Sequence, residues 1–164
     1  MNLEAIDQRQ PASEATASQY CTFVVSGMYF GIDVRHVQEV MRAQEVTAIP
    51  QAPDVIAGLI NLRGQIVTAI DMRQRLGLTG RESSVPPMNM VVRTDDGAAS
   101  LLVDEIGDVL DVDSSAFERI PDNLPSEHRE LIRGVCKLNG RLLLVLDAER
   151  ALELSQNPAG STVA

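Results

Sequence analysis

Residues 136–146 read Cys-Lys-Leu-Asn-Gly-Arg-Leu-Leu-Leu-Val-Leu, and this stretch decides the fold. The dipeptide Asn139-Gly140 is typical of a two-residue turn between antiparallel strands. Apolar residues continue on both sides of it, most strongly in the run from Leu142 to Leu146. The stretch therefore predicts a β-hairpin.

The chain repeats this hairpin and its surroundings. One set of positions matches a second set at an offset of 76 residues: Ile56, Gly58, Leu62, Gly64, Ile66, Asp71 and Leu76 against Ile132, Gly134, Leu138, Gly140, Leu142, Asp147 and Leu152. Upstream, Val34, Val37 and Val40 match Val103, Ile106 and Val109 at an offset of 69 residues. The repeat predicts two similar units of about 70 residues each.

Three further strand–turn–strand patterns complete these units. They cover residues 20–25 with 28–32, 59–62 with 65–70, and 88–93 with 99–103. Short helices are expected over 34–41, 72–76 and 148–154, the last two after the capping residues Asp71 and Asp147. With about ten strands, the fold class is all-β with a few short helices, and a unit of about five strands is expected to close into a small barrel.

The predicted domain spans residues 19–155. Its first barrel unit covers about 20–80 and its second about 88–154. Residues 1–18 and 156–164 are polar and without period, so we expect them to be disordered tails. Each unit is too small to bury a large core alone, so the two barrels should pack together and leave a groove that can hold a partner.

Charge and hydropathy exclude several classes of protein. The 164 residues carry 14 basic and 23 acidic side chains, a net charge of -9. That balance argues against a nucleic-acid binder and against binding to an anionic membrane surface. No apolar run approaches a membrane span, and the first residues lack the pattern of a signal peptide. We therefore expect a soluble cytoplasmic protein.

The sequence also lacks a recognisable catalytic motif. Cys21 and Cys136 lie in apolar runs and are expected to be core residues, and neither His36 nor His128 has a neighbour at metal-ligand spacing. We expect no catalytic residues, no metal and no cofactor. Counting residues does not exclude a triad assembled in space, so a small ligand-binding or catalytic β-barrel stays as the alternative.

Several ordered motifs resemble those of one family, the CheW-like coupling proteins of bacterial chemotaxis. The matching segments are Phe30-Gly31-Ile32-Asp33-Val34, Val37-Gln38-Glu39-Val40, Ile49-Pro50, Ile56-Ala57-Gly58, Asn61-Leu62-Arg63-Gly64 with the strand to Met72, and Val103 to Leu110. Together they cover about residues 20–154. Thr68 departs from a proline that is common in the family, which is a minor change because threonine suits a strand better.

The resemblance implies two intertwined five-stranded barrels and an adaptor without catalysis. Its expected partners are the cytoplasmic tip of a chemoreceptor and the regulatory domain of the histidine kinase CheA, so it would lie at membrane receptor arrays through these partners. The resemblance assigns receptor binding to Val37, Glu39, Val40, Gly58 and Arg63, and leaves the kinase-binding residues unknown. It also leaves open a related system such as twitching motility.

The residues themselves allow more than one role. Arg63 could be a plain turn residue, or it could pair with Glu39 across the groove between the barrels or with a receptor carboxylate. On the predicted helix, Val37 and Val40 are expected to point inward while Glu39 stays on the rim. Gly58 and Gly134 are expected to supply a turn or a helix end before the hairpin strand, or to permit the close approach of a partner.

Overall fold

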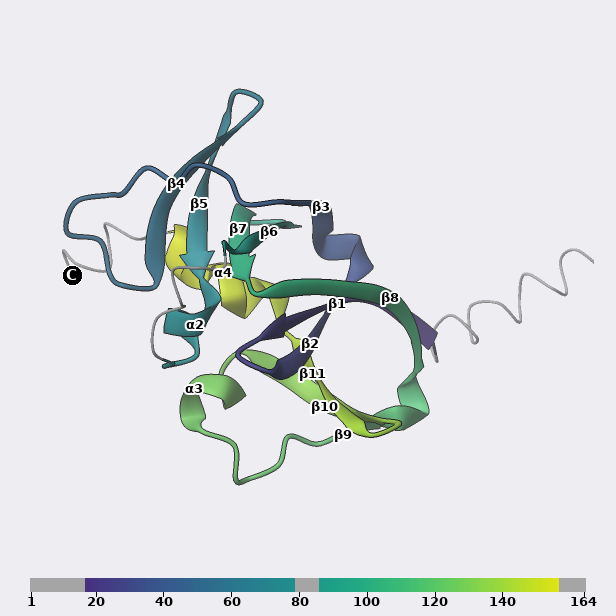
Figure 1. Ribbon diagram of the computed structural model, residues 1–164. Helices are drawn as coiled ribbons and strands as arrows, with labels where there is room; N and C mark the ends of the chain where they lie inside the picture. Colours follow the sequence, from purple (N-terminus) through teal and green to yellow (C-terminus); the bar gives the residue numbers. More distant parts are fainter. Residues whose placement is uncertain (1–16, 79–85, 157–164) are drawn as a thin grey trace, which may run out of the picture.

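The computed structural model describes residues 17–78 and 86–156, so the predictions for 1–16 and 157–164 lie outside the described residues. Figure 1 shows two sheets packed against each other, with short helices between and beside them. The described part of the chain contains eleven strands, and all four predicted hairpins are confirmed by their strand pairing.

The first sheet has six strands in the order β8-β1-β2-β11-β10-β9. Its members are β1 (Ala17–Val25), β2 (Met28–Asp33), β8 (Glu105–Asp113), β9 (Phe117–Glu118), β10 (Ile132–Leu138) and β11 (Arg141–Leu146). Neighbours run antiparallel except β11 and β2, which pair in parallel.

The second sheet has five strands in the order β3-β6-β7-β5-β4. Its members are β3 (Val37–Met41), β4 (Ile56–Leu62), β5 (Gln65–Asp71), β6 (Met88–Thr94) and β7 (Gly97–Val103). Here β5 and β7 form the parallel pair. When each strand is replaced by its equivalent in the repeat, the strand order and the position of the parallel pair are the same as in the first sheet.

The two repeats exchange strands to build these sheets. The six-stranded sheet takes the β1–β2 hairpin from the first repeat and its other strands from the second, and the five-stranded sheet does the reverse. Neither sheet is therefore built from residues 20–80 or 88–154 alone. This exchange is what makes the two barrels intertwined, as expected.

Each sheet closes into a barrel by the same device. After β3, the chain returns so that Thr47 pairs with Leu59 of β4, the opposite edge of the five-stranded sheet. In the repeat, β8 continues through a short 3₁₀ helix, η2 (Ser114–Ala116), into β9, where Glu118 pairs with Val135 of β10. We call these sheets the five-stranded barrel and the six-stranded barrel.

Gly58 and Gly134 permit these closures. A Cβ at Gly58 would overlap the carbonyl oxygen of Thr47, and the residue has a φ of +150°. A Cβ at Gly134 would lie 2.7 Å from the ring of Phe117. The expectation of a turn or helix end at these glycines was wrong: both lie within strands, beside a bulge, where the closing segment approaches closely.

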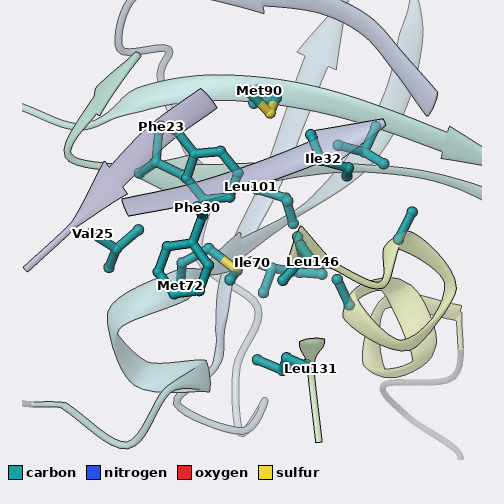
Figure 2. Close-up of a cluster of buried hydrophobic side chains, with 14 of the residues drawn as sticks. Phe23, Val25, Phe30, Ile32, Ile70, Met72, Met90, Leu101, Leu131 and Leu146 are labelled. Carbon is teal, nitrogen blue, oxygen red and sulfur yellow. The ribbon is translucent and has the colours of Figure 1, made fainter. Parts of the chain in front are cut away.

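The largest hydrophobic core lies between the two barrels. It joins residues of both sheets with α2 (Met72–Arg75) and α4 (Ala148–Gln156), and Figure 2 shows ten of its side chains labelled. The rings of Phe23 and Phe30 stack at its centre with centroids 5.4 Å apart. Each barrel has a smaller core of its own. Asp71 and Asp147 cap α2 and α4 as predicted.

The helix expected over residues 34–41 is wrong. Only η1 (Val34–His36) is helical, as a single 3₁₀ turn, and the chain then forms strand β3. A register shift between Val37 and Glu39 adds one residue to the strand, so Val37 and Val40 lie opposite Val92 and Met90, which both face the central core. A bulge of this kind gives a strand the three-residue spacing of a helix. The remaining short helix is α3 (Ser126–Arg129).

Candidate partner-binding surface

The β4–β5 hairpin ends in a turn that presents Arg63. Arg63 and Gly64 both have positive φ, +54° and +90°, which suits a two-residue hairpin turn. The side-chain oxygen of Asn61 accepts a hydrogen bond of 2.8 Å from the backbone N–H of Gly64 and fixes the turn. Figure 1 shows this hairpin extending away from the rest of the molecule. Arg63 therefore stands at an exposed end of the five-stranded barrel.

Arg63 binds Glu39 through both guanidinium NH₂ groups. The two hydrogen bonds measure 3.0 and 2.9 Å, one to each carboxylate oxygen. The Arg63 side chain is 78% exposed, whereas that of Glu39 is 19% exposed. Glu39 lies opposite Val91, a residue of the core inside the five-stranded barrel. The carboxylate is therefore at the end of this barrel's interior, and the arginine covers it.

Of the roles left open for Arg63, the structure shows the pair with Glu39, but the place expected for this pair is wrong. The pair does not span the groove between the barrels. It joins β3 to the β4–β5 hairpin within one barrel, and β3 and β4 are the two edges that the Thr47–Leu59 bridge closes. Since Glu39 lies on a strand and faces inward at the barrel end, its expected place on a helix rim is corrected as well.

The other residues assigned to receptor binding lie in different environments. Val37 is partly buried and packs against the central core, as expected. Val40 was expected to point inward, but it is 40% exposed because β3 is an edge strand. Gly58 is buried in the seam of the five-stranded barrel. The structure thus brings Glu39 and Arg63 into contact, sets Val40 beside them on the opposite face of β3, and keeps Gly58 away from the surface.

Sequence reasoning missed three exposed apolar side chains. Ile66 is 57% exposed, Val109 is 53% exposed and Leu142 is 37% exposed. With Val40 they form two pairs that are equivalent in the repeat, Val40 with Val109 and Ile66 with Leu142. The repeat offsets relate the members of each pair, but strand alternation does not identify them as exposed, because Ile66 shares a face with buried Ile70 and Leu142 with buried Leu144.

The titratable groups near the junction of the barrels have internal partners. Asp33 accepts two hydrogen bonds from the Arg35 side chain, of 3.0 and 2.7 Å, and these lower the pKa of the Asp33 carboxyl below its usual range despite its burial. Burial raises the pKa of the thiols of Cys21 and Cys136, which favours the neutral form that a core cysteine needs. We therefore assign Asp33, Cys21 and Cys136 roles in the fold.

The described surface is hollowed near the barrel junction and beside the end of β3. The first hollow, of about 110 Å³, is lined by Asp33, His36, Arg133, Leu146, Asp147, Ala148 and Glu149. The second, of about 380 Å³, is open and mostly apolar, with a lining of Arg42, Ala43, Pro86, Pro87 and Met88. Among the described residues, no three His, Cys, Asp or Glu side chains gather in a metal-binding arrangement. No helix in this part of the chain is long and apolar enough to cross a membrane.

Comparison with known proteins agrees with this architecture. The family model of the CheW-like domain matches residues 19–156. The chain is 30% identical to the chemotaxis protein CheW of Bacillus subtilis over 138 residues, covering 84% of this chain and 88% of that protein. It is 29% identical to CheW of Klebsiella aerogenes, covering 86% and 85% of the two chains.

A solved structure has the same fold. The scaffolding protein TtCheW from Thermoanaerobacter tengcongensis superposes with a TM-score of 0.75 at 25% identity, over 86% of this chain and 96% of that one. The ligand-binding or catalytic barrel that composition alone left open is not favoured by these relatives. The chain belongs to the CheW-like family and is a coupling adaptor of chemotaxis, a scaffold without catalysis of its own.

Proposed function

We propose that the chain holds two partners at once, the cytoplasmic tip of a chemoreceptor and the regulatory domain of the histidine kinase CheA, on two different surfaces. The observation that carries this proposal is the exposed ion pair Arg63–Glu39 at one barrel end, with an exposed valine beside it on β3. Exposed charged groups of this kind contribute little to folding and more to the choice of partner.

The receptor surface in this proposal is the end of the five-stranded barrel. Arg63 offers its exposed guanidinium and Val40 an apolar contact, while Glu39 holds the arginine in place. Val37 and Gly58 support the surface from within, through the central core and the barrel seam. A helical tip with an acidic and an apolar side chain fits such a surface.

The kinase surface in this proposal is the equivalent end of the other barrel, formed by the β10–β11 hairpin of the six-stranded barrel. Leu142 is exposed there at the start of its strand, as Ile66 is in the other barrel. The kinase domain is expected to have homologous barrels, so a barrel-to-barrel contact with aliphatic anchors is favoured. Because the receptor segment is cytoplasmic, we infer that the adaptor works on that side of the membrane, at receptor arrays.

The test measures binding to each partner alone. A receptor cytoplasmic fragment and a CheA regulatory domain are titrated separately into the chain by calorimetry, and then together. We expect two 1:1 complexes, one ternary complex, and a kinase affinity that survives high salt.

Two variants assign the surfaces. Val40→Ser should weaken only the receptor complex, and Leu142→Ser only the kinase complex. Asp54→Ser, at an exposed loop position, is the control and should leave both complexes intact. Competition between the two partners, or loss of both complexes in either variant, would contradict separate surfaces.

A further inference from the structure

The β10–β11 end of the six-stranded barrel carries an arginine with an unusual partner. Arg141 is the first residue of β11, directly after the turn, and its guanidinium carbon lies 3.7 Å from the ring centroid of Tyr29 on β2. The strands β11 and β2 are neighbours in the sheet. A cation placed over an aromatic face in this way is attracted to the ring, and the contact fixes where the guanidinium lies.

This stacking leaves the donors of Arg141 unused. Arg141 pairs with Leu138 through its main chain, but within residues 17–78 and 86–156 no hydrogen bond or ion pair engages its guanidinium. The side chain is exposed and Leu142 beside it is exposed as well. A planar guanidinium that is held by its face still presents its N–H groups at its edge, in the geometry that a carboxylate accepts.

The other barrel indicates what such an arginine binds. At the equivalent end of the five-stranded barrel, the hairpin arginine, Arg63, meets the carboxylate of Glu39 from edge strand β3. In the repeat, Glu39 corresponds to Asp108 of β8, which has a shorter side chain and is exposed, and Arg63 corresponds to Asn139. Asp108 makes no ion pair with Arg141. At one barrel end the arginine is therefore paired with a carboxylate of the same chain, whereas at the other the oriented arginine and the carboxylate of Asp108 do not pair.

We propose that Arg141, oriented by Tyr29, receives an Asp or Glu side chain of the kinase regulatory domain, next to an apolar residue that packs on Leu142. This inference rests on the proposed function, since it takes the β10–β11 end as the kinase surface. It makes Arg141 the residue that selects the correct partner there, while Leu142 supplies the apolar contact.

Calorimetric titration of the full chain with the CheA regulatory domain, at several salt concentrations, tests the proposal. Arg141→Gln should weaken binding about 5- to 20-fold at low salt and flatten the salt dependence, because the variant no longer contributes a charge. Arg141→Lys should recover part of the affinity, since lysine keeps the charge but loses the planar fork. Tyr29→Leu should cost about 2- to 5-fold, because the arginine is no longer preoriented.

The outcomes separate this inference from the function on which it rests. If Leu142→Ser loses kinase binding while Arg141→Gln keeps wild-type affinity and salt dependence, the surface is right and the carboxylate contact is wrong. If both variants bind as the wild type does, the kinase surface itself is misplaced. Melting temperatures of all variants are measured alongside, and the Arg141 variants should stay within a few degrees of the wild type because the side chain is exposed.

Discussion

Replacing Arg63 by alanine separates binding from folding. The Arg63 side chain is mostly exposed and its partner Glu39 is at the surface end of the barrel, so loss of the pair should cost about 0.2–1 kcal/mol of unfolding free energy. For a chain of this size that lowers the melting temperature by roughly 1–4 °C. Receptor affinity should fall by about 1–3 kcal/mol, or roughly 5- to 150-fold, as for loss of a charge-assisted contact.

A second substitution at Arg63 controls for the backbone. The residue has a φ of +54°, a conformation that costs most residues about 1 kcal/mol but that asparagine tolerates. Arg63→Asn should therefore lose the receptor as Arg63→Ala does, yet melt closer to the wild type. This difference between the variants comes from the turn and not from the ion pair.

Circular dichroism melting and calorimetry with the receptor fragment and the kinase domain, each alone, measure these effects. Kinase binding should survive in both variants. The reasoning is refuted if both variants lose the two partners equally, or if both melt more than about 6 °C below the wild type. Either result would make the Arg63–Glu39 pair a structural element of the barrel seam.

Three further predictions concern stability. Asp33→Asn should lose the pH dependence of stability that Asp33 contributes. Because Arg35 lowers the folded-state pKa of this carboxyl, its stabilisation is present above about pH 4 and is lost as the pH falls through the lowered pKa. Melting curves between about pH 7 and pH 2 will detect the loss. Gly58→Ala should cost about 2 kcal/mol or more in urea unfolding, whereas Gly64→Ala, where a Cβ meets open space, should cost about 1 kcal/mol from backbone strain alone. Phe30→Ala should cost about 3–5 kcal/mol in the same assay, since the ring is fully buried in the central core.

The hairpins could be predicted from the sequence because their signals are local. Turn dipeptides such as Asn139-Gly140 lie between apolar runs, and both signals act within a few residues. The helix predicted over residues 34–41 was wrong for a physical reason. Val37 and Val40 share a face in a bulged strand just as they would in a helix, and only pairing with β6, some 50 residues away in the chain, decides between the two.

The candidate site could be predicted in part. A contact between Glu39 and Arg63 was one of the alternatives left open, and it forms, but the sequence did not indicate which strands the repeats exchange. That exchange depends on how the long-range pairs pack, and it moved the ion pair from the groove to the seam of one barrel. The exposed positions Ile66 and Leu142 were missed because an aliphatic residue in a strand pattern is usually assigned to the core.

In our proposal, the repeat lets one small chain hold two partners. Duplication gives two barrel ends with equivalent exposed apolar residues, Ile66 and Leu142. Equivalent ends would bind the same partner, so discrimination must come from side chains that differ. The difference is the state of one arginine at each end: Arg63 is neutralised by Glu39, whereas Arg141 is held by a ring and keeps its donors unused. In our proposal, partner choice depends on a few polar side chains at the hairpin ends, while the exchanged strands and the shared core join the two ends in one molecule.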